Sequence, residues 1–130
     1  MSEKLYLGYI LDKSQRDKQI FIELKCVNKK KIWLGLISIY EVEISHQDIN
    51  RIIIRLQQNM ISHIGSFRQE FYAHFYCGEE LIVVFRDKVF HATCDPDTWR
   101  AAKQYGRSLG IVEKQLDFLT PEENRAKYFR

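Results

Sequence analysis

Two histidines and two cysteines recur at one spacing in the second half of the chain. His74 precedes Cys77 by three residues, and His91 precedes Cys94 by three residues. Two His and two Cys are a ligand set of tetrahedral zinc sites. Residues three apart on a strand, however, point to opposite faces of the sheet, so neither pair converges unless it lies on a turn. We therefore predict no metal site here and no bound cofactor.

Cys94 could also act as a nucleophile. It directly precedes Asp95, the expected N-cap of a helix, and the positive end of a helix dipole lowers the pKa of a nearby thiol. The negative charge of Asp95 opposes that effect. The residues of the enzyme hypothesis are His74, His91 and Cys94, placed in a pocket between a helix and the sheet.

A third pattern lies near the N-terminus. Asp12 is followed by Glu23-Leu24-Lys25, with Glu23 and Lys25 on one face of an expected strand. An aspartate followed by Glu-x-Lys on a strand resembles the motif of metal-dependent nucleases. The resemblance implies that the carboxylates hold Mg²⁺ and that Lys25 assists the attacking water. The alternative is a solvent-facing hairpin.

Basic residues gather in two places. One group surrounds an expected turn and includes an aromatic residue that could stack on a base: Lys25, Lys29, Lys30, Lys31 and Trp33. The other forms a stripe on an expected helix: Arg100, Lys103 and Arg107. Both groups could bind phosphates. Solvated charges at a sheet edge or on the outer face of a helix would give the same sequence pattern. Nucleic-acid binding is therefore not favoured.

Paired carboxylates are a fourth candidate for chemistry. Glu41 and Glu43 share a strand face, and Glu79 and Glu80 lie in a turn. Nothing in the sequence places either pair in a pocket, so both are expected to be solvated.

The elements that would position these residues fall into two similar runs. Alternating apolar residues predict strands over 5–11, 19–27 and 31–44, with a turn at 28–30 and a bend or a bulge at Gly35. The second run predicts strands over 71–76, 81–85 and 88–93, joined by two-residue turns at 78–79 and 86–87.

Each run is followed by a helical pattern. Ser45 begins the first, and Asp95 with Pro96 begins the second, which ends at Gly110. Thr120 announces a short final helix to about residue 130. The predicted fold class is α+β: an antiparallel sheet built from two three-strand runs, each followed by an amphipathic helix packed on the sheet (βββα-βββα), in one domain spanning residues 1–130.

The composition argues against two classes of function, nucleic-acid binding and membrane association. The 130 residues carry 20 Lys and Arg against 17 Asp and Glu, a net charge of +3, which is far from a strongly basic nucleic-acid footprint. Three cysteines and no apolar run of membrane-spanning length predict a soluble, cytoplasmic protein that does not associate with membranes.

Both faces of the second strand run look apolar, so either the helices and the C-terminal segment or another subunit must cover them. Within that segment, Leu116, Phe118 and Leu119 are expected to lay the chain back over the sheet. We expect a non-catalytic binding or assembly module that forms a homodimer or binds another protein. A small enzyme with a His/Cys pocket is the alternative, and a weak nucleic-acid-binding protein is the second alternative.

Overall fold

A six-stranded antiparallel sheet forms the centre of the computed structural model, which describes residues 4–32 and 34–129. The strand order is β2-β3-β1-β6-β7-β8. The strands are β1 (Leu5–Leu11), β2 (Lys25–Ile32), β3 (Ile37–Ser45), β6 (Tyr72–Cys77), β7 (Glu80–Phe85) and β8 (Val89–Thr93). The sheet is thus two three-strand units that meet where β1 pairs with β6.

Helices and short elements connect the strands. The helices are α1 (Gln19–Glu23), α2 (Ile49–Asn59), α3 (Arg100–Ser108) and α4 (Pro121–Tyr128). Single 3₁₀ turns are η1 (Asp12–Ser14), η2 (Pro96–Trp99) and η3 (Glu113–Gln115). A small hairpin of β4 (His63–Ile64) and β5 (Phe67–Arg68) leads from α2 into β6. None of the described helices has the length and apolar character needed to cross a lipid bilayer.

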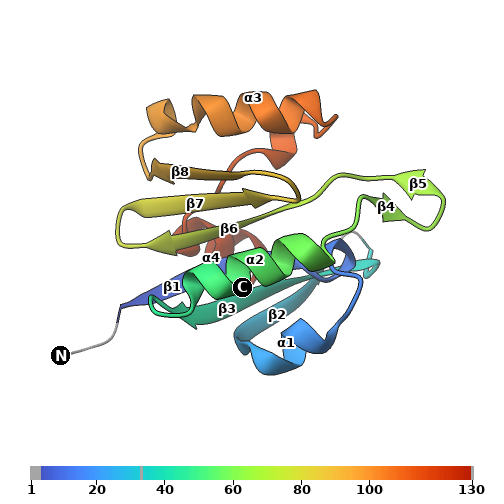
Figure 1. Cartoon of the computed structure of the whole chain (residues 1–130), viewed down its shortest axis with the longest axis horizontal. Helices are drawn as coiled ribbons and strands as arrows, with labels where there is room; N and C mark the ends of the chain where they lie inside the picture. Colours follow the sequence, from blue (N-terminus) through green and yellow to red (C-terminus); the bar gives the residue numbers. More distant parts are fainter. Residues whose placement is uncertain (1–3, 33, 130) are drawn as a thin grey trace.

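The two faces of the sheet have separate covers (Figure 1). On one face, Leu56 of α2 packs in a buried cluster with Ile10 and Phe75. On the other face, α3 and the residues that follow it bury Val83 and Phe85 together with Leu116 and Phe118. Burial of these faces therefore requires no second subunit. The expectation that the C-terminal segment lies back over the sheet is confirmed.

The first run of strands differs from its prediction in its second strand and in its third, which was predicted over 31–44 and is β3 only from Ile37. The segment predicted as a strand over 19–27 is helical at its start, and β2 begins only at Lys25. The reason is burial: Ile20, Phe21 and Leu24 pack against the core, and their spacing fits one helical turn rather than alternate strand positions. Asp17 also accepts a hydrogen bond from the backbone N–H of Gln19 (2.9 Å).

The first predicted turn is also displaced. The turn expected at 28–30 is part of β2, and the chain reverses instead between Ile32 and Ile37. Gly35, expected to bend a long strand, lies in this turn with φ +81°. The bulge is between Cys26 and Asn28 of β2. The lysines at 29–31 therefore lie along an edge strand and not around a hairpin tip.

The second run agrees with its prediction in register. Two-residue turns at 78–79 and 86–87 pair His74 with Val83, and His91 with Ile82. The caps are also confirmed: Asp95 accepts from Asp97 N (3.0 Å), and Thr120 forms a capping box. The structure is α+β with an antiparallel sheet, but the βββα-βββα order is not matched. A helix interrupts the first run, a hairpin precedes the second, and the helices cover different faces.

Candidate functional site

A pocket of about 100 Å³ lies where the two halves of the sheet separate. The register between β1 and β6 covers Leu7–Tyr76, Gly8–Phe75 and Tyr9–His74 and then ends. Strand β1 nevertheless continues beside β3 as far as Leu11. The two halves therefore diverge next to Tyr9 and His74, and the space between them is the pocket, which we call the junction pocket.

Three parts of the chain line the junction pocket. The first half contributes Tyr9, Leu11, Ile32 and Ile39, and the second half contributes Gln69, Glu70, Phe71, Tyr72 and His74. The remaining wall comes from Ile111, Gln115, Asp117, Asn124 and Tyr128. These last residues belong to the C-terminal segment 111–128, which we call the tail. The shape of the pocket therefore depends on how the tail is held.

The tail is fastened first by hydrogen bonds from β6. The side chains of Tyr72 and Tyr76 donate to the carbonyl oxygens of Gln115 and Phe118. Between them, the Nε2 atom of His74 lies 3.3 Å from the carbonyl oxygen of Leu119. Residues 115–119 are not part of a strand, and these donors satisfy carbonyl oxygens that no sheet partner satisfies. The carbonyl oxygen of Leu119 also accepts from Nδ2 of Asn124 (2.8 Å).

The second fastening is an ion pair between a buried carboxylate and a half-exposed guanidinium. Glu41 of β3 is fully buried, and its carboxylate accepts from the Nε and Nη2 atoms of Arg125 in α4 at 3.1–3.2 Å. It also accepts from the hydroxyl of Tyr9 (2.5 Å) and from Nδ2 of Asn28 (2.8 Å). The prediction that Glu41 is solvated is wrong. Its neighbour Glu43 is partly buried and pairs with the exposed Lys25, 3.1 Å away.

These contacts shift the ionisation of both partners. Burial raises the pKa of Glu41, but the hydrogen bonds from Tyr9, Arg125 and Asn28 outweigh it and hold the pKa below its ordinary value. Burial and the hydrogen bond to Glu41 raise the pKa of Tyr9 far above its ordinary value. Glu41 therefore stays charged and Tyr9 stays protonated at neutral pH.

Burial also sets the charge of His74. Its ring packs among the aromatic rings of Tyr9, Tyr72, Tyr76 and Phe118. Removal from water lowers the pKa of His74 to about 4. The ring is therefore neutral at pH 7. Because a carbonyl can only accept, the proton lies on Nε2, and Nδ1 keeps its lone pair.

The other predicted histidine and cysteine positions do not join this site. His91 is exposed on the opposite sheet face from His74, as its pairing with Ile82 requires. The Cys94 thiol lies 3.8 Å from the carbonyl oxygen of Gly78, and burial with the charge of Glu79 raises its pKa. Within the described ranges, no cluster of three or more His, Cys, Asp or Glu could hold a metal ion.

The nuclease-like residues are engaged separately. Asp12 accepts from the backbone N–H of Ser38 (2.9 Å). Glu23 pairs with Arg55, whose hydrogen bond lowers the pKa of the Glu23 carboxyl. Lys25 pairs with Glu43, so these three residues do not converge on a metal position.

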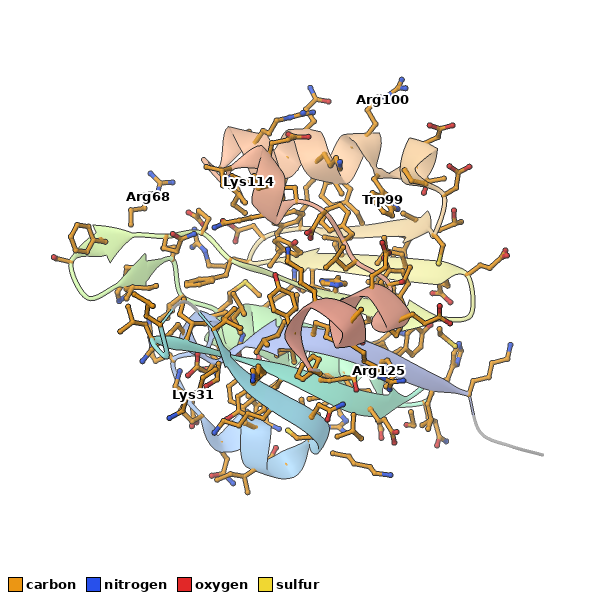
Figure 2. The ribbon with its side chains drawn as sticks, turned by 180° about the vertical axis from the view of Figure 1, so that it is seen from behind. Lys31, Arg68, Trp99, Arg100, Lys114 and Arg125 are labelled. Carbon is orange, nitrogen blue, oxygen red and sulfur yellow. The ribbon has the colours of Figure 1, made fainter. Side chains whose placement is uncertain are left out.

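The two basic groups lie on different elements at opposite edges of the sheet (Figure 2). Lys29 lies over the ring of Tyr40, 5.3 Å from its centroid, and Lys30 and Lys31 are exposed on β2. Trp33 lies outside the described residues.

On α3, Arg100 is exposed, while Lys103 and Arg107 pair with Glu113 at 3.8 and 3.0 Å. The α3 stripe is therefore partly neutralised by its own neighbour.

Comparison with known proteins gives no relative: no family model, no curated protein and no solved structure matches the chain.

Sequence reasoning missed the two features that build the site. The burial of Glu41 depends on Arg125, which lies 84 residues away in the sequence. A local signal existed for the β6 donors, since Tyr72, His74 and Tyr76 alternate on one strand face.

Replacing Glu41 with Gln should lower the free energy of unfolding by about 2 kcal/mol at pH 7, because Arg125 loses its charged partner. The half-exposed guanidinium of Arg125 is partly screened by water, which reduces the loss. Urea denaturation of Glu41→Gln and Glu43→Gln makes the comparison. The matched Glu43→Gln variant should lose less than about 1 kcal/mol, because the Lys25 ammonium that pairs with Glu43 is largely exposed to water. Equal losses in the two variants would contradict the assigned role of Glu41.

The lowered pKa of His74 predicts that the free energy of unfolding changes with pH. Its pKa is about 4 in the folded chain and 6.5 ordinarily, so folding favours the neutral ring. The stability that this group contributes is complete above pH 6.5 and is lost as pH falls toward 4, by about 3 kcal/mol. Protonation of Glu41 changes the free energy of unfolding only below the ordinary pKa of a glutamate. The contribution of His74 can therefore be measured separately at higher pH.

The measurement is the free energy of unfolding from pH 7 to 4.5 in wild type and His74→Gln, which keeps a donor at this position. The wild-type slope should flatten in His74→Gln. Parallel curves for the two proteins would show that His74 is not the responsible group.

Proposed function

We propose that the protein is a non-catalytic binding module and that the junction pocket binds a small, uncharged ligand with an apolar body. The observation that carries this proposal is the separation of β1 from β6 beneath the tail, which leaves a concave site at the junction of two structural units. Concave sites lined by aromatic and aliphatic side chains with a few polar groups are the usual form of small-molecule sites.

The charge of the lining supports an uncharged ligand. Among the described lining residues none is Lys or Arg. The carboxylate of Glu70 already lies 3.3 Å from Arg68 and 3.8 Å from Arg86. Asp117 lies 3.7 Å from Lys127, and His74 is neutral. An anionic ligand would lose its hydration here without gaining a cationic partner.

The aromatic lining supports an apolar ligand body. Tyr9, Phe71, Tyr72 and Tyr128 come from all three parts of the chain that form the pocket. Flat rings stack on or meet the edges of such side chains favourably. The amide side chains of Gln69, Gln115 and Asn124 add polar groups that could orient the ligand.

The ionisation of the candidate catalytic groups supports binding rather than catalysis. A histidine with a pKa near 4 is a weak base at neutral pH, and a thiol with a raised pKa is a poor nucleophile. The enzyme hypothesis on His74, His91 and Cys94 stays a prediction, as do homodimerisation and nucleic-acid binding through Lys29, Lys30 and Lys31.

The test is an NMR titration of ¹⁵N-labelled protein with three aromatic molecules of similar size: neutral indole, cationic benzylamine and anionic benzoate. Indole should cause saturable shifts at Tyr9, Tyr72 and His74, and benzoate should bind at least about tenfold more weakly. Leu11→Phe should abolish the indole shifts, because the larger ring fills the pocket.

The matched control is Leu5→Phe, the same substitution on the same strand at a position outside the pocket lining. It should leave the shifts unchanged. Absence of saturable shifts with all three molecules, or equal effects of the two variants, would refute the proposal.

A further inference from the structure

Three exposed apolar side chains stand on two turns at one end of the molecule. Leu34 and Leu36 lie in the turn between β2 and β3 and are 101% and 70% exposed. Phe67 lies beside the β4–β5 turn and is 77% exposed. Both turns project at the same end of the sheet (Figure 1). We call these three residues the tip residues.

The backbone of one tip residue is strained. Leu34 has φ +59°, a left-handed conformation that a leucine rarely adopts and that Asn or Gly adopts more easily. Its side chain is fully exposed, so no contact within the described chain compensates for the strain. Sparsely populated conformations of this kind cluster where function requires them.

The chain around the tips is basic. Residues 29–36 contain three lysines and residues 61–69 contain Arg68, and neither segment contains Asp or Glu. In Figure 2, Lys31 and Arg68 both lie toward this end of the molecule.

The acidic groups next to the tips are engaged. Asp12 is hydrogen-bonded to the backbone of Ser38, and the buried Glu70 lies between Arg68 and Arg86. Glu70 in turn offsets part of the charge of Arg68, so Lys29, Lys30 and Lys31 supply most of the positive charge beside the tip residues.

We infer that the tip residues insert into the surface of an anionic lipid bilayer while the neighbouring lysines and Arg68 contact its headgroups. Exposed apolar patches mark protein or membrane contacts. A stable protein interface needs about 800 Å² of continuous surface on each partner, whereas these residues stand on two separate projections. A bilayer surface accepts separate projections, and anionic headgroups attract adjacent Lys and Arg.

This contact differs from spanning a membrane, and it is an alternative to the expectation that the protein does not associate with membranes. It is independent of the junction pocket.

The experiment is flotation of the purified full chain with vesicles of phosphatidylcholine alone or with 30% phosphatidylserine. Binding should be at least about fivefold stronger to the anionic vesicles for each basic residue engaged, and it should fall as NaCl rises. Leu34→Asn combined with Phe67→Ser should weaken binding about tenfold or more, since two apolar side chains no longer insert.

The substitution Leu34→Asn should leave the turn folded, because Asn tolerates a positive φ. The matched control is Ile54→Ala, which removes another exposed apolar side chain from the outer surface of α2. It should bind vesicles as the wild type does.

Three outcomes would overturn the inference. These are no flotation with anionic vesicles at low salt, equal binding to neutral vesicles, and equal losses in Ile54→Ala and the tip variant. Retention of a single-stranded oligonucleotide without vesicle binding would assign the basic residues to nucleic acid instead.

Discussion

The position of the tail depends on one buried carboxylate. Glu41 is enclosed by the sheet and α4, and Arg125, Tyr9 and Asn28 supply the hydrogen bonds that make its burial tolerable. An ionised carboxylate in an apolar interior is costly unless it is paired in this way. Because Arg125 belongs to α4, the requirement of Glu41 for a partner holds α4 against β3. The tail wall of the junction pocket, with Asn124 and Tyr128, is placed by the same contact.

Local patterns in the sequence predicted the second half of the sheet correctly. Two-residue turns at 78–79, which contains a glycine, and at 86–87 set the register of β6, β7 and β8. The placement of His74 and His91 on opposite faces of the sheet then followed from the alternation of side chains. The helix caps at Asp95 and Thr120 could also be predicted from local sequence. Each side chain accepts a hydrogen bond from a backbone N–H two or three residues later in the chain. Information of this kind is contained within a few residues of the chain.

The features that the sequence did not predict depend on distant partners. The segment at Gln19 forms a helix because Ile20 and Phe21 meet the core under α2, and apolar residues in so short a run fit a strand equally well. Glu41 was expected in solvent because two glutamates on a strand face normally are, and Arg125 is remote in sequence. The junction pocket requires both the end of β1–β6 pairing and the return of the tail. The apolar residues Leu116 and Phe118 predicted that the tail returns over the sheet, but no local pattern shows where the β1–β6 pairing ends.

Native-state hydrogen exchange of the α4 amides in wild type and Arg125→Met tests the role of Glu41 most directly. The Asn124 N–H donates to the carbonyl oxygen of Thr120 (2.8 Å) and reports whether α4 is formed. The account predicts that this amide exchanges about tenfold faster or more in Arg125→Met, while the amides of β6 and β7 keep their protection. Unchanged exchange in α4, or an equal increase throughout the sheet, would contradict it.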